Sequence, residues 1–266
     1  MISISKIWAE TRTLARQEWA LLFPLSLATC GLATMFNFLS VGNSVAAQTE
    51  PTVMIFAGLL VAILLTLVGQ LSIAALALGD RRSVNEALRL AVARLPSVAL
   101  LLLALFFVLL CVVFLGTILA QLSGADLLAT PPRLGAVTAF LILLVIALGV
   151  WLAGRTLTLY PVLMESDVAV SQVFSVFGRA FRSTKPVGQK LFGIVAATML
   201  LYSSLSNLLI NVAGRALMLV AKTVGMDGLV AVILAVLLGI LAAVVSIYFG
   251  VFQVKLYHHL QAETPR

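Results

Sequence analysis

Charged residues are scarce in this 266-residue sequence: only 10% of the chain is Asp, Glu, Lys or Arg, whereas 62% is hydrophobic. Such a composition excludes a water-soluble globular domain, which carries roughly 25% charged residues. The net charge of +7 does not indicate nucleic-acid binding, because the cations lie between apolar runs on alternate connections. We therefore expect one integral membrane domain covering residues 1–266, with no nucleic-acid partner.

Side chains that carry chemistry are also few. Cys30 and Cys111 lie inside apolar runs, without the spacing of a disulfide framework or a zinc site. His258 and His259 are adjacent in a segment that we expect to be a solvated tail. No Asp or Glu falls within a long apolar run, which removes the usual carboxylate of ion-coupled transporters. We predict a protein that is not an enzyme and has no catalytic residues, cofactor or metal.

Long apolar runs dominate what is present. Each has at least about 20 residues, enough to cross a hydrocarbon core of about 30 Å as a helix. The sequence therefore predicts an all-α polytopic protein. Its six predicted transmembrane helices cover residues 19–41, 53–79, 97–122, 134–158, 190–213 and 228–254.

Three amphipathic segments precede alternate apolar runs, at residues 3–18, 83–95 and 168–181. Their apolar residues recur with a helical period, which is typical of helices that lie in the membrane interface. Ser83 and Glu86 have the spacing of a capping box at the start of the second helix. Pro96 is expected to close this helix or to begin the next one.

The cations are distributed very unequally between the two sides of this topology. Fourteen of the 17 Lys and Arg residues lie on one side: in the N-terminal segment, in the connections that carry the amphipathic helices, at the adjoining end of the fourth predicted helix (Arg155), or in the tail. The other three are Arg133, Arg215 and Lys222. The positive-inside rule places the first set in the cytoplasm. We therefore expect a bacterial plasma (inner) membrane protein with cytoplasmic termini and three cytoplasmic interfacial helices.

An internal repeat supports the same arrangement. A shift of 85 positions places Leu67 on Leu152 and Arg94 on Arg179, and a weaker third copy aligns Ser5 with Ser83. The predicted architecture is three tandem units, each an interfacial helix followed by a two-helix hairpin. The repeats cover about residues 3–79, 83–164 and 168–254.

Arg155 is the one charged residue that enters a predicted transmembrane helix. Its side chain either reaches the interface with Trp151 and Tyr160 nearby, or holds a lipid headgroup or another anionic ligand. Pro161 predicts a kink just after it. Cations on and beside the amphipathic helices are candidate contacts to lipid or to a partner protein: Arg16, Arg94, Arg155, Arg179 and Arg182.

A polar stripe marks the fifth predicted transmembrane helix. Its members recur every four residues and therefore share one helix face: Ser203, Asn207, Asn211 and Arg215. The stripe could line a hydrated path. Alternatively, its members make hydrogen bonds between helices in the interior of the bundle, a common use of such residues in membranes.

The pattern R-x5-P-x3-E formed by Arg155, Pro161 and Glu165, followed by VFSVFGRAFRSTKP, resembles a known family. It is similar to the six-span membrane domain of some bacterial glycerophosphodiester phosphodiesterases and to its stand-alone relatives. The phrase EALRLAVARLPSVALLLL is similar to the first copy of that family's Ala-Leu-Arg helix. These 266 residues contain no catalytic barrel, so the resemblance does not imply phosphodiesterase activity.

Two functions follow as hypotheses. The first is a non-enzymatic membrane protein whose cytoplasmic amphipathic helices engage membrane lipids, in particular anionic phospholipid, or a protein partner or second copy. The alternative is a permease or lipid-moving protein that uses the space between the three units. A water-accessible cavity beside Asn207 would favour the alternative, and a packed centre would favour the first hypothesis.

Overall fold

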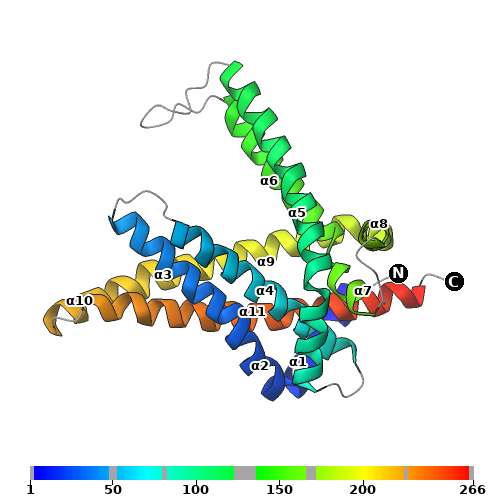
Figure 1. Ribbon diagram of the computed structural model, residues 1–266, viewed down its shortest axis with the longest axis horizontal. Coiled ribbons are helices and arrows are strands. Elements are labelled where there is room, and N and C mark those ends of the chain that lie inside the picture. The colour runs from blue at the N-terminus through cyan, green and yellow to red at the C-terminus, as the bar shows by residue number, and fades with distance from the viewer. Residues whose placement is uncertain are drawn as a thin grey trace. The chain divides into compact units, whose positions relative to one another are not determined.

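Figure 1 presents a computed structural model of the chain. The structure describes residues 3–47, 53–79, 83–122, 136–165, 172–224 and 227–263, and these contain helices and no β-strand. The all-α prediction is confirmed for this part of the chain.

The helices follow one another with short connections. In chain order they are α1 (Ile4–Gln17), α2 (Trp19–Ser26), the π-helical η1 (Leu27–Gly31), α3 (Leu32–Ala47), α4 (Val53–Leu78), α5 (Val84–Leu122), α6 (Ala136–Arg155), α7 (Leu159–Glu165), α8 (Val173–Ser183), the 3-10 turn η3 (Lys185–Val187), α9 (Gly188–Leu208), the π-helical η4 (Leu209–Ala213), α10 (Gly214–Val224) and α11 (Asp227–Glu263).

Within the described ranges, six helical stretches are long and apolar enough to cross a membrane. They correspond one by one to the six predicted transmembrane helices, so the polytopic prediction is confirmed by length and composition. The chain divides into two compact units. The first unit comprises Met1–Leu95, Thr158–Asp167 and Thr198–Arg266, and the second comprises Pro96–Leu157 and Val168–Ala197.

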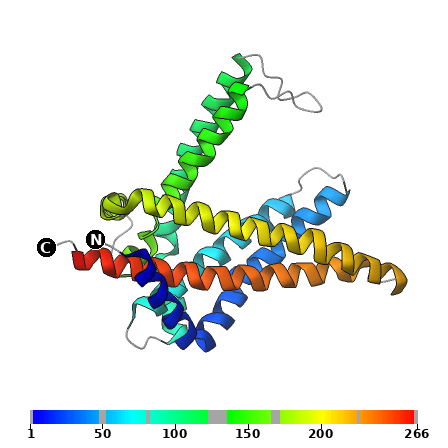
Figure 2. The same ribbon diagram turned by 180° about the vertical axis from the view of Figure 1, so that it is seen from behind.

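In the first unit, α11 is the central element. It packs against α1, α2, η1, α3, α4 and α7, and both views show α1 beside its C-terminal part (Figures 1 and 2). Buried side chains from α2, α4 and α11 form part of the core between these helices, including Leu22, Ile73 and Ile247.

Glycine allows the helices of the first unit to approach closely. A Cβ added to Gly31 would lie 2.9 Å from the carbonyl oxygen of Gly239, so α11 and η1 meet backbone to backbone. Nearby, the Ser26 hydroxyl donates a hydrogen bond of 2.9 Å to the carbonyl of Ala243. Close approach and an interhelical hydrogen bond together are a typical means of joining transmembrane helices.

Helix α1 does not stand apart from the bundle. Ile7, Thr11 and Ala15 are buried, and the Trp8 ring lies 6.0 Å from that of Phe252 on α11. The predicted apolar face of residues 3–18 is therefore the face that packs inside the first unit.

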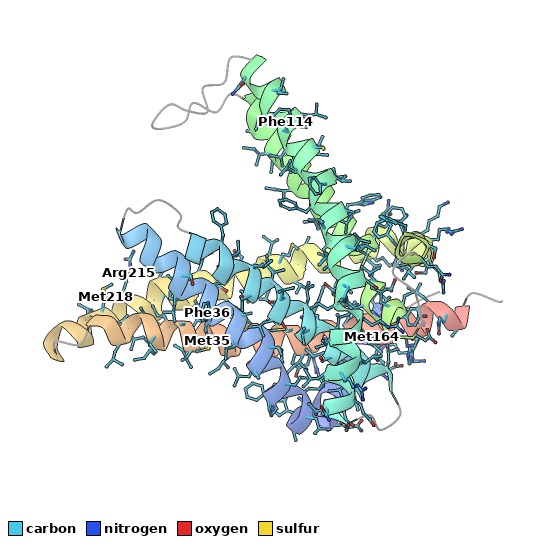
Figure 3. The ribbon with its side chains drawn as sticks, viewed as in Figure 1. Met35, Phe36, Phe114, Met164, Arg215 and Met218 are labelled. Carbon is cyan, nitrogen blue, oxygen red and sulfur yellow. The ribbon has the colours of Figure 1, made fainter. Side chains whose placement is uncertain are left out.

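In the second unit, the later part of α5 and α6 run side by side as a hairpin (Figures 1 and 2). Bulky apolar side chains are exposed on α5, including Phe106, Phe107 and Phe114. Phe114 is labelled in Figure 3. The composition of residues 97–122 predicts a helix that faces lipid, and the exposure of these side chains agrees with that prediction. Helix α8, the turn η3 and the start of α9 complete the unit.

The expectation for Pro96 is wrong. Helix α5 begins with the predicted capping box, in which the Ser83 amide donates to Glu86 (3.0 Å) and the Glu86 amide to the Ser83 hydroxyl (3.3 Å). It then continues through Pro96 to Leu122. Proline is tolerated within such helices because neighbouring groups and local adjustments satisfy the freed backbone.

Two predicted ends are also wrong. Helical structure after Lys185 continues through η4 and α10 to Val224, and α11 extends to Glu263 rather than stopping near residue 254. The predicted tail is therefore a packed helix end, since His259 contacts Glu10 at 3.1 Å. Polar side chains that find partners on α1 and α7 allow the helix to continue beyond its apolar run.

Candidate functional site

The C-terminal end of α6 is where the unusual features of the second unit meet. Helix α6 ends at Arg155, a turn covers residues 156–158, and α7 begins at Leu159. The predicted interruption next to Pro161 is thus confirmed. Because the helix stops here, the Arg155 carbonyl accepts a hydrogen bond of 2.9 Å from the hydroxyl of Thr184, which follows α8.

Gly154 brings α6 against the beginning of α9. A Cβ added to this glycine would lie 3.3 Å from the amide nitrogen of Phe192 and 3.4 Å from the carbonyl carbon of Leu191. The two main chains are therefore close enough that any larger residue would press on backbone. This contact places Arg155 next to the first turn of α9.

The guanidinium of Arg155 is covered by aromatic rings. Its central carbon lies 4.4 Å from the ring centre of Phe181 and 5.6 Å from that of Trp151, and the two rings meet edge to face. Only 9% of the residue is exposed. A guanidinium over an aromatic face is stabilised by about 0.5–2 kcal/mol.

That stabilisation does not replace hydrogen bonds. The Nε atom is buried without a partner, and within the described chain the guanidinium makes no hydrogen bond or ion pair. Burying an ionised group without a counter-charge is costly. Among the described residues, the Nε donor of Arg155 is therefore left without an acceptor.

Further cations lie in the segments that surround this end of α6. Arg179 and Arg182 are exposed on α8, while Lys185 and Lys190 are exposed on η3 and α9. Across its described residues (96–122, 136–157 and 172–197) the second unit contains these five cations and no Asp or Glu. We call Arg155, Arg179, Arg182, Lys185 and Lys190 the basic cluster.

The candidate contacts predicted from sequence thus fall in different places. Arg155 contacts Phe181 of α8, the helix that also carries Arg179 and Arg182. The Nε of Arg182 donates a hydrogen bond of 3.2 Å to the Gly178 carbonyl of the same helix. Arg16 is exposed on α1 and Arg94 is half-buried on α5, both in the first unit. Arg81, Arg82, Arg133 and Arg266 lie outside the described residues.

The polar stripe is exposed. Ser203, Asn207, Asn211 and Arg215 all present accessible side chains, and the Asn211 amide donates to the Asn207 carbonyl of its own helix (2.9 Å). The expectation that they face the bundle interior is not met. Of the four, only Asn211 lies in the π-helical η4, which the sequence does not reveal. Ser203 and Asn207 lie on α9, and Arg215, labelled in Figure 3, lies on α10.

A second polar group lies in the first unit. The Tyr257 hydroxyl donates to Glu165, and the Gln261 amide donates to the same carboxylate at 3.0 Å.

Two cavities of about 300 and 200 Å³ are lined partly by Glu18 and by Thr66, respectively. Asn207 lines neither of these two cavities. No group of three His, Cys, Asp or Glu side chains suited to a metal occurs among the described residues.

Sequence reasoning missed the groups that position Arg155. Gly188 lies against its guanidinium and Thr184 holds its carbonyl. Both residues follow Arg155 by about 30 positions, and no local sequence pattern connects them to it. No family model, curated protein or solved structure matches the chain.

Proposed function

We propose that this chain is a non-enzymatic integral protein of a bacterial plasma membrane that binds anionic lipid through the basic cluster. One observation carries the proposal: five cations and no acidic residue lie in the described part of the second unit, and the Nε atom of one of them, Arg155, is buried without a hydrogen-bond partner there. Each cation near an anionic membrane surface contributes on the order of 1 kcal/mol to binding.

Helix α8 has the character needed at a membrane surface. Phe174 is 62% exposed, Phe177 and Phe181 are half-buried, and Arg179 and Arg182 are exposed. A helix with exposed aromatic and basic residues can place its rings among acyl chains and its cations among headgroups. The cytoplasmic leaflet is the one rich in anionic lipid, which agrees with the orientation that the cation distribution predicts.

The three-unit architecture is part of this proposal. Helices α1, α5 and α8 follow the N-cap residues Ser3, Ser83 and Gln172. In each helix, the residues four and eight positions after the N-cap are buried. These positions are occupied by Ile7 and Thr11, Ala87 and Ala91, and Val176 and Ala180. This pattern of burial pairs Ser83 with Ser3 and with Gln172. The second pairing is a shift of 89 positions, four more than the sequence repeat that pairs Arg94 with Arg179. Kinship with the phosphodiesterase membrane domain also belongs to the proposal, without its catalysis.

Orientation is tested by reporter fusions in a bacterial host. Fusions at Glu50, Asp126 and Asp227 should report the external side, and fusions at Asp80 and Asp167 the cytoplasm. The expectation rests on fourteen cations against three. External signals from the Asp80 and Asp167 fusions would contradict the proposed cytoplasmic placement of the basic cluster.

Lipid binding is tested by the phospholipid that remains bound after purification in mild detergent, measured by mass spectrometry. We expect wild type to be enriched in phosphatidylglycerol relative to the whole membrane. The double variant Arg179→Gln/Arg182→Gln should lose part of this enrichment, and Arg215→Gln, a matched exposed cation in the first unit, should not. A lipid composition equal to that of the bulk membrane would contradict the proposal.

The exposed polar stripe favours a second candidate, a permease or lipid-moving protein. Four polar side chains on the outside of a transmembrane helix are costly against acyl chains, so a wetted path along them would stabilise the arrangement. A cysteine at Asn207 should then react with a water-soluble maleimide in intact membranes, whereas a cysteine at Leu208 should not. Equal protection of both cysteines would remove this candidate.

A further inference from the structure

We propose that Arg155 and the first turn of α9 form a binding site for a phosphate group at the depth of the lipid headgroups. The inference rests on the proposed function and deepens it, since it assigns one defined site and one chemical group within the basic cluster. The exposed cations attract anionic lipid in general, whereas Arg155 holds a single phosphate.

The first argument is the unsatisfied charge of Arg155. Its guanidinium has five N–H donors. The residue as a whole is nine-tenths buried, and the Nε atom is buried without a hydrogen-bond partner among the described residues. The rings of Trp151 and Phe181 cover it but accept no conventional hydrogen bond. An anionic acceptor that completes the fork is the group this environment lacks.

The second argument is the neighbouring helix terminus. Gly188 is the first residue of the 21-residue α9, and a Cβ placed on it would lie 3.2 Å from Nη1 of Arg155. The guanidinium therefore rests against the start of α9, which follows directly on the 3-10 turn η3. Helix N-termini bind phosphate through their N–H groups and through the helix dipole.

The third argument concerns the identity of the anion. Lys185 and Lys190 are exposed three residues before and two residues after Gly188 in the sequence, so the segment adds two cations to the guanidinium of Arg155. The phosphodiester of a phospholipid carries one negative charge on two non-bridging oxygens and has two further ester oxygens. A planar guanidinium pairs two of those oxygens at once.

The depth of the site fits a headgroup. Helix α6 has 20 residues, so it is about 30 Å long, which equals the thickness of the hydrocarbon core. Arg155 is its last residue and lies at one end of the exposed apolar hairpin. The phosphate can come from a phospholipid or from a soluble phosphate compound, and the experiment separates these sources.

The test uses the whole protein in mild detergent, with phosphatidylglycerol or phosphatidylcholine added and bound lipid counted by native mass spectrometry at low and high salt. High salt screens the exposed cations but acts weakly on a buried contact. We expect wild type to keep one phosphatidylglycerol at high salt. Arg155→Lys should lose about tenfold in affinity, because an ammonium replaces a two-point fork by a point charge.

A second pair of variants perturbs the geometry without changing charge. Gly188→Ala pushes its methyl group against Nη1 of Arg155 and should weaken retention at high salt. Gly193→Ala lies on the same helix with nothing within 4 Å of the new Cβ, and should retain lipid like wild type. These variants keep the test decisive even if Arg155→Lys does not fold.

The outcomes are distinguishable. If wild type binds phosphatidylglycerol no better than phosphatidylcholine at low salt, the proposed function itself fails. If wild type prefers phosphatidylglycerol but Arg155→Lys and Gly188→Ala match it at high salt, only the phosphate site is overturned. Displacement of the retained lipid by millimolar inorganic phosphate identifies a soluble phosphate as a ligand, and resistance to displacement identifies the headgroup.

Discussion

The first and second units show two ways for apolar helices to exist in one chain. In the first unit, 44% of the most apolar window of α11 is buried, and small or polar residues line its contacts. In the second unit, only 12% of the corresponding window of α5 is buried, and Leu, Val and Phe cover the surface. Hydrophobicity alone therefore does not determine burial in this protein.

Side-chain size explains the difference. Acyl chains are as apolar as leucine, so a leucine-rich helix gains little by exchanging lipid for protein. Gly31, Gly69, Gly239 and Gly250 instead allow the backbones of the first unit to come close. Dispersion contacts and hydrogen bonds that lipid cannot provide then hold the helices together.

A large effect is predicted from filling the closest backbone-to-backbone contact among these glycines. Gly31→Ala places a methyl group 2.9 Å from the Gly239 carbonyl oxygen, a backbone atom that cannot move independently. We expect a loss of about 1–3 kcal/mol in the free energy of unfolding, as for other overpacked cores. Reversible unfolding in mixed detergent micelles measures it.

The control lies in the second unit. A Cβ at Gly116 on α5 meets nothing within 4 Å, so Gly116→Ala should be neutral or stabilising by up to about 1 kcal/mol through helix propensity. If both variants lose the same stability, close packing does not distinguish the two units.

A smaller effect is predicted for the contact between α6 and α9. Gly154→Ala would place its Cβ 3.3 Å from the Phe192 amide nitrogen, a milder overlap than at Gly31. We expect a loss of about 1 kcal/mol, with none for Gly149→Ala on the same helix, where the space is open. Thermal unfolding of both variants in detergent checks the difference, and equal melting temperatures would contradict the close approach at Gly154.

A third prediction concerns hydrogen bonds between helices. Ser26→Ala removes the bond to the Ala243 carbonyl and should cost about 0.6 kcal/mol, the average for such bonds in membranes. Thr117 bonds only to the Phe114 carbonyl of its own helix in the second unit, so Thr117→Ala should cost less. A greater loss for Thr117→Ala in the same unfolding assay would reverse the comparison.

The sequence predicts the number and type of helices because a run of about 20 apolar residues has few alternatives in a bilayer. It predicts their ends less well. The sequence predicts a helix boundary at Pro96, but α5 continues past it. It predicts a solvated tail after Val254, but these residues remain helical and make contacts such as that between His259 and Glu10. Those contacts join segments that are distant in the sequence, so local sequence patterns do not predict them.

The candidate site shows the same limit. The sequence singles out Arg155 because a charge next to an apolar run is conspicuous, and Pro161 predicts the interruption beside it. It does not predict that Phe181 covers the guanidinium or that Gly188 lies against it. Asn207 and Asn211 are four residues apart, which predicts that they lie on the same helix face. The spacing does not predict whether that face packs against protein or is exposed, and here it is exposed.

The smallest effect is predicted for the outer surface of the second unit. Phe114 is 63% exposed on α5, so Phe114→Ala removes few protein contacts, and acyl chains can occupy the space (Figure 3). We expect a change within about 0.5 kcal/mol, as for other surface substitutions. Phe252 on α11, only 1% exposed, is the matched residue of the first unit, and its truncation should cost about 3–5 kcal/mol. Unfolding of both variants in mixed micelles measures the pair. A loss at Phe114 comparable to that at Phe252 would mean that another protein surface, rather than lipid, covers this part of α5.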